Sequence, residues 1–281
     1  MGAATPQDNH NARVSDRLDT SVPHPARRYN YWLGGKDNFA VDRRSGDQIA
    51  AVYPAIRTLA RENRAFLQRA VRYLAADVGI RQFLDIGTGI PSADNTHEVV
   101  QAVAPDARVL YVDNDPMVLV HARALLTSSQ AGATAYLDAD LRDPARILAA
   151  GELHRTLDLS RPVALILVAV AHFLTDADRP YDVVARLVDA LPSGSYLVVS
   201  HVTTDLMSAE IVDLWTAEVV AGRMKQDAVA RSRAEFARFF AGLDLVEPGI
   251  VPVTEWRAEV PESERSPLTE ASIYGAVARK P

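Results

Sequence analysis

The sequence contains no cysteine, and this absence excludes disulfide bonds, zinc–thiolate sites and cysteine nucleophiles. It also lacks an apolar run of the roughly 20 residues that a membrane-spanning helix needs. The longest such run, residues 162–174, is interrupted by His172. The N-terminal residues include no apolar segment of the signal-peptide type. We therefore expect a cytoplasmic protein that does not contact a membrane.

Positively charged residues are also fewer than negatively charged ones: the sequence has 30 Lys and Arg residues and 36 Asp and Glu residues, which gives a net charge of −6. This balance argues against a general attraction to nucleic acid, and we expect no nucleic-acid partner. A local basic patch formed by Arg27, Arg28 and Lys36 is possible despite this negative net charge. We expect its arginines to be solvated. The sequence does not indicate an oligomeric state.

The length of 281 residues suits one large α/β domain with additions. Residues 1–20 are polar and without pattern, and predict a mobile tail. Residues 21–80 predict a helical arm or lid. Its aromatics and glycines precede an amphipathic helix over about 54–76, with Arg69 and Arg72 outside the apolar stripe.

Residues 81–281 alternate strand and helix five times, which predicts parallel crossover units. Two further strands, over residues 243–253 and 273–279, are joined by a loop and predict an antiparallel hairpin. We therefore predict an α/β fold with a Rossmann-like, seven-stranded mixed sheet flanked by helices, with six parallel strands and one antiparallel. The helices predicted for this part cover residues 96–104, 117–126 and 178–191.

The clearest local signal is a short apolar strand that runs into a glycine turn at Gly87 and Gly89. Such a turn lets backbone N–H groups approach a ligand closely. After one helix-length gap, a second apolar strand ends at Asp113, whose carboxylate can accept hydrogen bonds from ribose hydroxyls. The two features predict a cofactor that contains a nucleoside.

The third glycine of the dinucleotide fingerprint is missing, since Ser92 occupies its position after Pro91. Asp85 would repel a pyrophosphate, but it could orient a loop or bind an amino group. S-adenosylmethionine fits these constraints because it has adenosine, an ammonium and a sulfonium but no phosphate. The sequence thus favours this cofactor, and an NAD-dependent oxidoreductase remains the alternative.

Four segments resemble a known family, namely residues 31–39 (YWLGGKDNF), 83–91 (FLDIGTGIP), 111–116 (YVDNDP) and 140–144 (DLRDP). They are similar to the class I S-adenosylmethionine-dependent methyltransferases. More narrowly, they resemble the actinobacterial S-adenosyl methyltransferase family, once catalogued as a domain of unknown function. The resemblance extends from about residue 21 to the C-terminus. It implies methyl transfer from S-adenosylmethionine to an acceptor.

The resemblance also implies which residues hold the cofactor. Each expected contact lies at or just after the end of a strand. The methionine portion and the sulfur would lie near Asp85, the turn of Gly87, Thr88 and Gly89, and the segment of Val168 and Ala169. Asp113 would bind the ribose hydroxyls, Asn114 would lie beside the adenine, Asp140 would accept from its exocyclic amine, and the Leu141 N–H would face a ring nitrogen.

Three of these assignments have alternatives, the first being that Gly87 and Gly89 merely end a strand. Asp115, rather than Asp113, could bind the ribose, and the other would then cap the helix that begins near Pro116. Asp138 and Asp140 present the same choice, and Asp143 could cap a helix. The three carboxylates at positions 138, 140 and 143 could chelate incidentally, but we predict no metal.

Methyl transfer is an in-line displacement that depends mainly on positioning, and it needs a base only if the acceptor must lose a proton. His172, after the fourth strand, is the candidate base, although a histidine at such a junction often serves only to brace a loop by hydrogen bonds. His201 could line the same opening. Tyr31, Lys36 and Asn38 could close over the cofactor carboxylate or belong to a purely structural arm.

The sequence thus predicts a methyltransferase that acts on an oxygen or nitrogen atom of a small-molecule acceptor. A non-catalytic module that binds S-adenosylmethionine or its demethylated product is the alternative, because no base is clearly indicated. The identity of the acceptor lies beyond the sequence.

Overall fold

The computed structural model describes residues 19–125, 128–225 and 227–281. The tail predicted over residues 1–20 therefore lies, apart from its last two residues, outside the described residues. Among those described, no helix combines the length and apolar composition that crossing a bilayer requires.

Within the described residues one eight-stranded sheet has the order β3-β2-β1-β4-β5-β8-β6, and β7 also pairs with β8. The first five strands are parallel, and β8 is antiparallel to β5. This confirms the predicted Rossmann-like mixed sheet. The bounds are β1 Gln82–Ile86, β2 Arg108–Asp113, β3 Ala133–Asp138, β4 Ala164–Leu167, β5 Tyr196–Val202, β6 Asp244–Leu245, β7 Val251–Pro252 and β8 Ile273–Arg279.

The strand expected over residues 243–253 is interrupted, and its two pieces are β6 and β7. Both pair antiparallel with the same side of β8, away from β5. Between them Pro248 has no N–H to donate, and Gly249 adopts a left-handed φ of 82°. These two residues turn the chain out of the ladder, so one predicted strand becomes two short ones.

The helices flank the sheet on both faces. They are α2 Pro25–Trp32, α3 Ala40–Val52, α4 Ile56–Tyr73, α5 Thr96–Val103, α6 Pro116–Leu125, α7 Pro144–Ala149, α8 Gly151–Thr156, α9 Pro180–Asp189, α10 Ala209–Val220 and α11 Arg233–Ala237. A π-helical turn, Leu74–Val78, extends α4 and ends at Gly79, which has a φ of 84°. The helices predicted near residues 54, 96, 117 and 178 are all present.

Side chains alternate between two cores because successive strand residues point to opposite faces. In the fully buried strand β4, Leu165 packs in one core and Ile166 in the other. The first core also contains Leu187 of α9, and the second contains Phe66 of α4. A central strand buried on both faces explains why its sequence is continuously apolar.

One arginine of α4 departs from its expected surface position. Arg69 is half-buried, and its Nε and Nη2 atoms donate to the backbone oxygens of Trp256 and Val253 at 2.9 and 2.6 Å. Arg72, in contrast, is exposed and pairs with the exposed Glu259. Arg69 therefore fixes the C-terminal segment onto α4, a role that helical periodicity alone does not predict.

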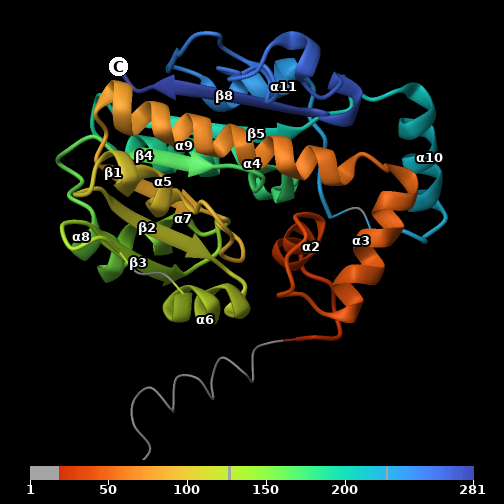
Figure 1. Ribbon diagram of the computed structural model, residues 1–281, viewed down its shortest axis with the longest axis horizontal. Coiled ribbons are helices and arrows are strands. Elements are labelled where there is room, and N and C mark those ends of the chain that lie inside the picture. The colour runs from red at the N-terminus through yellow and green to blue at the C-terminus, as the bar shows by residue number, and fades with distance from the viewer. Residues whose placement is uncertain (1–18, 126–127, 226) are drawn as a thin grey trace, which may run out of the picture.

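The arm helices α2 and α3 lie beyond one end of the sheet, the end towards which the arrowheads of β2 and β4 point (Figure 1). These are the carboxyl ends of the parallel strands, where open α/β sheets bind their ligands. The arm thus lies on the side of the sheet where the expected site residues are found.

Candidate functional site

The glycine turn after β1 depends on glycine at both positions. Gly87 and Gly89 have left-handed φ values of 75° and 69°. A Cβ atom at position 87 would lie 2.4 Å from a methyl carbon of Val170, whereas one at position 89 would meet nothing within 4 Å. The turn therefore packs against the loop after β4 at Gly87 and has open space at Gly89.

The Asp113 carboxylate at the end of β2 is buried and joins two loops. Its Oδ2 accepts from the backbone N–H of Gly89 at 2.8 Å, and its Oδ1 accepts from the backbone N–H of Asp115 at 2.9 Å. Burial raises its pKa, although these two hydrogen bonds act in the opposite direction. Asp115, through Oδ1, caps α6 at the N–H of Met117. Between the two acids, Asp115 is thus the helix cap.

Asp85 is buried near the carboxyl end of β1 and connects this strand to α5. Its Oδ2 accepts a hydrogen bond of 2.6 Å from the hydroxyl of Thr96, the first residue of that helix. Burial raises the pKa of Asp85 to about 6, and the Thr96 hydrogen bond offsets part of this effect. We did not foresee the role of Thr96 from the sequence.

Asn114 and Asp140 come together at the ends of the neighbouring strands β2 and β3. The Asn114 side chain donates to Asp140 Oδ2 at 2.8 Å. Arg142 donates to the same carboxylate through its backbone and through Nη1 at 2.8 and 3.0 Å. Asp143 instead caps α7 at the N–H of Arg146. Within the part of the chain described, the Leu141 N–H has no acceptor.

The loop after β4 contains a strained residue. Ala169 has a φ of 56°, which side-chain-bearing residues rarely adopt, and its N–H donates to the Ser200 hydroxyl at 2.9 Å. Val168 beside it is half-buried. Strain of this kind clusters at functional sites, where the surroundings hold the residue in place. The sequence did not indicate Ser200 as the residue that holds this loop.

His172 and His201 are brought together, with 5.8 Å between their ring centroids. Burial, together with the charge of Arg231, lowers the pKa of His172 well below its usual value and that of His201 to about 4. Arg231 donates to His201 Nε2 at 2.9 Å, so we assign the ring proton to Nδ1, 2.8 Å from the Val202 carbonyl oxygen. His201 therefore braces Arg231. His172 Nδ1 has no hydrogen-bond partner among the described residues.

The three arm residues expected near the cofactor differ in their surroundings. The Tyr31 hydroxyl donates to Asp47 at 2.8 Å, which turns this side chain towards α3. Asn38 is buried and donates to Asn30 at 2.9 Å. Lys36 is exposed and makes no hydrogen bond or ion pair with any described residue. Tyr31 and Asn38 thus hold the arm together.

The expectation that Arg27 and Arg28 are solvated is wrong. Both are buried in α2, and each meets a carboxylate from a distant part of the sequence. Arg28 pairs with Asp227, and Arg27 Nε lies 3.3 Å from Asp115 Oδ2. The local sequence gives no sign of such distant partners, so burial of these arginines is not predictable from it.

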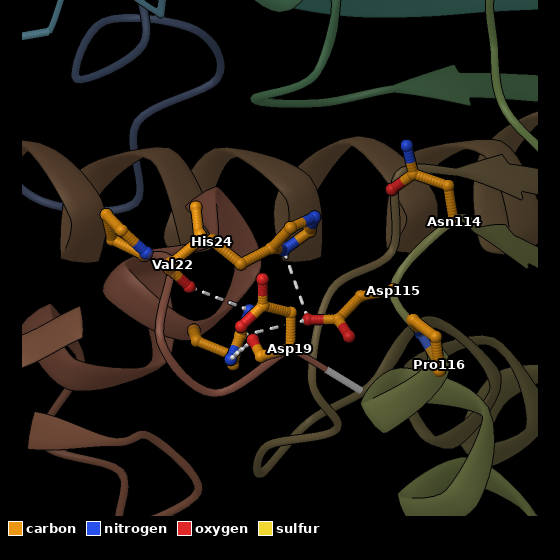
Figure 2. Close-up of a pocket in the computed structure, with 8 residues that line it drawn as sticks. Asp19, Val22, His24, Asn114, Asp115 and Pro116 are labelled. Atoms are coloured by element: carbon orange, nitrogen blue, oxygen red, sulfur yellow. Dashed lines mark hydrogen bonds and ion pairs between the residues drawn. The ribbon is translucent and has the colours of Figure 1, made fainter. Parts of the chain in front are cut away.

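Figure 2 shows the pocket between the arm and the loop after β2, where the side chain of His24 points towards Asp115. The two side chains are 3.1 Å apart, measured from Nδ1 to Oδ2. The pocket has a volume of about 270 Å³ and is lined by Asp19, Val22, Pro23, His24, Arg27, Asn114, Asp115 and Pro116. It adjoins Asn114, the residue expected beside the adenine.

The sequence and the fold are both similar to those of known proteins. A family model described as S-adenosyl methyltransferase matches residues 11–281. A DUF574 family protein from Streptomyces avermitilis is 46% identical, with a TM-score of 0.87, and the match covers 94% of this chain and 99% of that one. A proposed methyltransferase from Thermobifida fusca is 42% identical, with a TM-score of 0.83 and coverages of 94% and 97%. No curated protein matches at a significant level. Because the family model matches nearly the whole chain, this protein belongs to the S-adenosyl methyltransferase family.

Proposed function

We propose that the protein transfers the methyl group of S-adenosylmethionine to an oxygen or nitrogen atom of a small-molecule acceptor. The observation that carries this proposal is the convergence of four loops at the carboxyl ends of β1, β2, β3 and β4. They contribute the glycine turn, Asp113, the Asn114–Asp140 pair and the strained Ala169. This end of the sheet presents the glycine backbone of the turn, which a ligand can approach closely, and carboxylates that can accept hydrogen bonds. A ligand with ribose hydroxyls and an adenine amine requires such groups.

Asp113 retains acceptor capacity for the ribose hydroxyls. An ionised carboxylate can accept about four hydrogen bonds, and the N–H groups of Gly89 and Asp115 use two of them. Asp140 is half-exposed, so its oxygens can also meet the adenine amine beside Asn114. The Leu141 N–H, for which the described residues supply no acceptor, can donate to a ring nitrogen. These donors and acceptors match the polar edge of adenosine.

The methionine portion would lie against Gly87, Thr88 and Gly89, with Asp85 near its amino group and with Val168 and Ala169 beneath the sulfur. The bound cofactor supplies a methyl group on a positively charged sulfur. The chain holds this group in line with the acceptor atom, which supplies much of the rate enhancement in such a displacement. Lys36, in the proposed lid of residues 21–80, is free to pair with the cofactor carboxylate.

His172 is our candidate for the base. Its imidazole is neutral because burial lowers its pKa, and its Nδ1 is not used by any described residue. A low pKa makes it a weak base, so it suits an acceptor whose proton is already acidic. If it acts in this way, His172→Asn should lower kcat by about 10²-fold or more and leave cofactor affinity unchanged.

A module that binds the cofactor without turnover is the second candidate, favoured by the same burial of His172. We would incubate the protein with methyl-labelled S-adenosylmethionine and metabolite extracts, and titrate it with S-adenosylhomocysteine by calorimetry. Label transfer to a small molecule supports the enzyme. Tight binding with no labelled product in any extract supports the module, and absence of binding refutes the cofactor. The cytoplasmic location stays a prediction.

A further inference from the structure

We infer that Asp115 is a positioning residue through which the arm orients the Asp113 carboxylate for the cofactor. This inference rests on the proposed function, because it takes Asp113 to be the ribose acceptor. According to this inference, the contacts of His24 and Arg27 with Asp115 are required for cofactor affinity. This effect is separate from the contribution of the same contacts to stability.

Asp115 connects three parts of the molecule. Its Oδ1 caps α6, and its backbone N–H donates to Asp113 Oδ1 at 2.9 Å. Its Oδ2 faces the arm, 3.1 Å from His24 Nδ1 and 3.3 Å from Arg27 Nε. The side chain is 1% exposed. A displacement of this buried carboxylate would therefore move the amide that holds Asp113.

On the arm side, the guanidinium of Arg27 is fixed before it meets Asp115. It donates to the carbonyl oxygens of Asp19 and Val22 at 3.2 and 3.3 Å, and its Nε lies 3.7 Å from Asp42. Asp42 is held in turn by the backbone N–H groups of His24 and Phe39. The arm thus presents a rigid positive group to the loop after β2.

The surroundings of Asp115 favour its charged form. Burial alone would raise the pKa of Asp115, but the contact with His24, the Met117 N–H and the charge of Arg27 outweigh it and lower the pKa. Its Oδ2 accepts no hydrogen bond of standard geometry from the described residues. A buried carboxylate that loses its cation becomes strongly unfavourable, so the loop would rearrange to reach water.

The same loop carries Asn114, which forms one wall of the pocket in Figure 2. Rearrangement would therefore disturb both the residue proposed for the ribose and the one proposed beside the adenine. Arg28, the next residue of α2, is also buried, but it contacts Ser45 and Asp227 and not the loop after β2. It provides a matched control for general loosening of the arm.

The test compares Asp115→Asn, Arg27→Met and the control Arg28→Met in the full-length protein. S-adenosylhomocysteine affinity is measured by calorimetry and Tm by thermal unfolding. We expect both Asp115→Asn and Arg27→Met to weaken binding by about tenfold or more, whereas Arg28→Met changes it less than about threefold at a similar loss of Tm. His24→Gln is a milder variant if either of the first two fails to fold.

A double-variant cycle tests whether Asp115 acts through Asp113. If it does, Asp113→Asn combined with Asp115→Asn binds no more weakly than Asp113→Asn alone. Additive losses would overturn the inference. So would wild-type affinity in Asp115→Asn, or equal weakening in Arg27→Met and Arg28→Met. If the wild-type protein itself does not bind S-adenosylhomocysteine, the proposed cofactor fails and this inference fails with it.

Discussion

The Asp113 carboxylate and the backbone N–H of Gly89 are joined by a hydrogen bond of 2.8 Å. Gly89 belongs to the turn after β1 and Asp113 ends β2, so this bond fixes one loop against the other. A second hydrogen bond, from the N–H of Asp115, fixes the same carboxylate from the other side. Asp113 is therefore structural in the free protein, whatever it binds.

We expect Asp113→Ala to lose both stability and affinity. Two backbone donors would lose their acceptor, which costs about 1–3 kcal/mol of unfolding free energy, and the lost ribose bonds cost a similar amount of cofactor binding. Urea unfolding and titration with S-adenosylhomocysteine measure the two effects separately. Unchanged affinity in a folded Asp113→Ala protein would refute the ribose assignment.

The two glycines of the turn should respond differently to alanine. At Gly89 the only penalty is the left-handed backbone, about 1–2 kcal/mol, because a Cβ there meets open space. At Gly87 the same penalty is joined by a clash with Val170, 2.4 Å away. Urea unfolding of Gly87→Ala and Gly89→Ala should therefore show the larger loss at position 87. Equal losses would mean that the turn and the loop after β4 separate easily.

Asp85 predicts an unusual dependence of stability on pH. Its pKa is about 6 in the folded protein and near 3.8 when exposed. Between these values the unfolded chain has released the proton while the folded protein keeps it, so stability falls as the pH rises through this interval and remains lower above it. The shift corresponds to about 3 kcal/mol.

Asp85→Asn removes this ionisation and keeps an oxygen that can accept from Thr96. We expect it to unfold at a higher urea concentration than wild type at pH 7.5, and at a similar one at pH 4.5. A stability difference that is the same at both pH values would show that ionisation of Asp85 is not its cause. If Asp85 lies near the cofactor ammonium, the same variant should bind S-adenosylhomocysteine more weakly.

Arg69 and Arg72 of α4 form a matched pair for a stability test. Arg69→Met leaves the carbonyl oxygens of Trp256 and Val253 without their charged donor, and should cost about 2–4 kcal/mol of unfolding free energy. Arg72→Met removes only an exposed ion pair with Glu259 and should cost less than about 1 kcal/mol. Chemical denaturation of both variants checks the ranking, and a reversed order would contradict the anchoring role of Arg69.

The sheet and the glycine turn were predictable because their signals are local. The apolar run of β4 and the Gly87–Gly89 turn depend on neighbours in the sequence, and the parallel direction of consecutive strands follows from the helices that connect them. The interruption between β6 and β7 also had a local signal, since Pro248 and Gly249 stand together in the middle of the expected strand.

The contacts that the sequence could not indicate all join distant segments. The residues that neighbour Arg27 in the sequence do not indicate that Asp115 is its partner. Those that neighbour Arg69 do not indicate its hydrogen bond to the Trp256 carbonyl oxygen. Such pairings depend on how the chain packs in three dimensions, and residue type alone limits them only weakly.

The divided strand beside β8 also affects how the molecule meets other copies of itself. An uninterrupted outer strand would present a long row of free N–H and C=O groups, to which another extended chain could add. Here that border consists of β6 and β7, two residues each, with a Pro-Gly turn between them, and Pro252 has no N–H to offer. The break therefore protects this margin of the sheet against edge-to-edge aggregation.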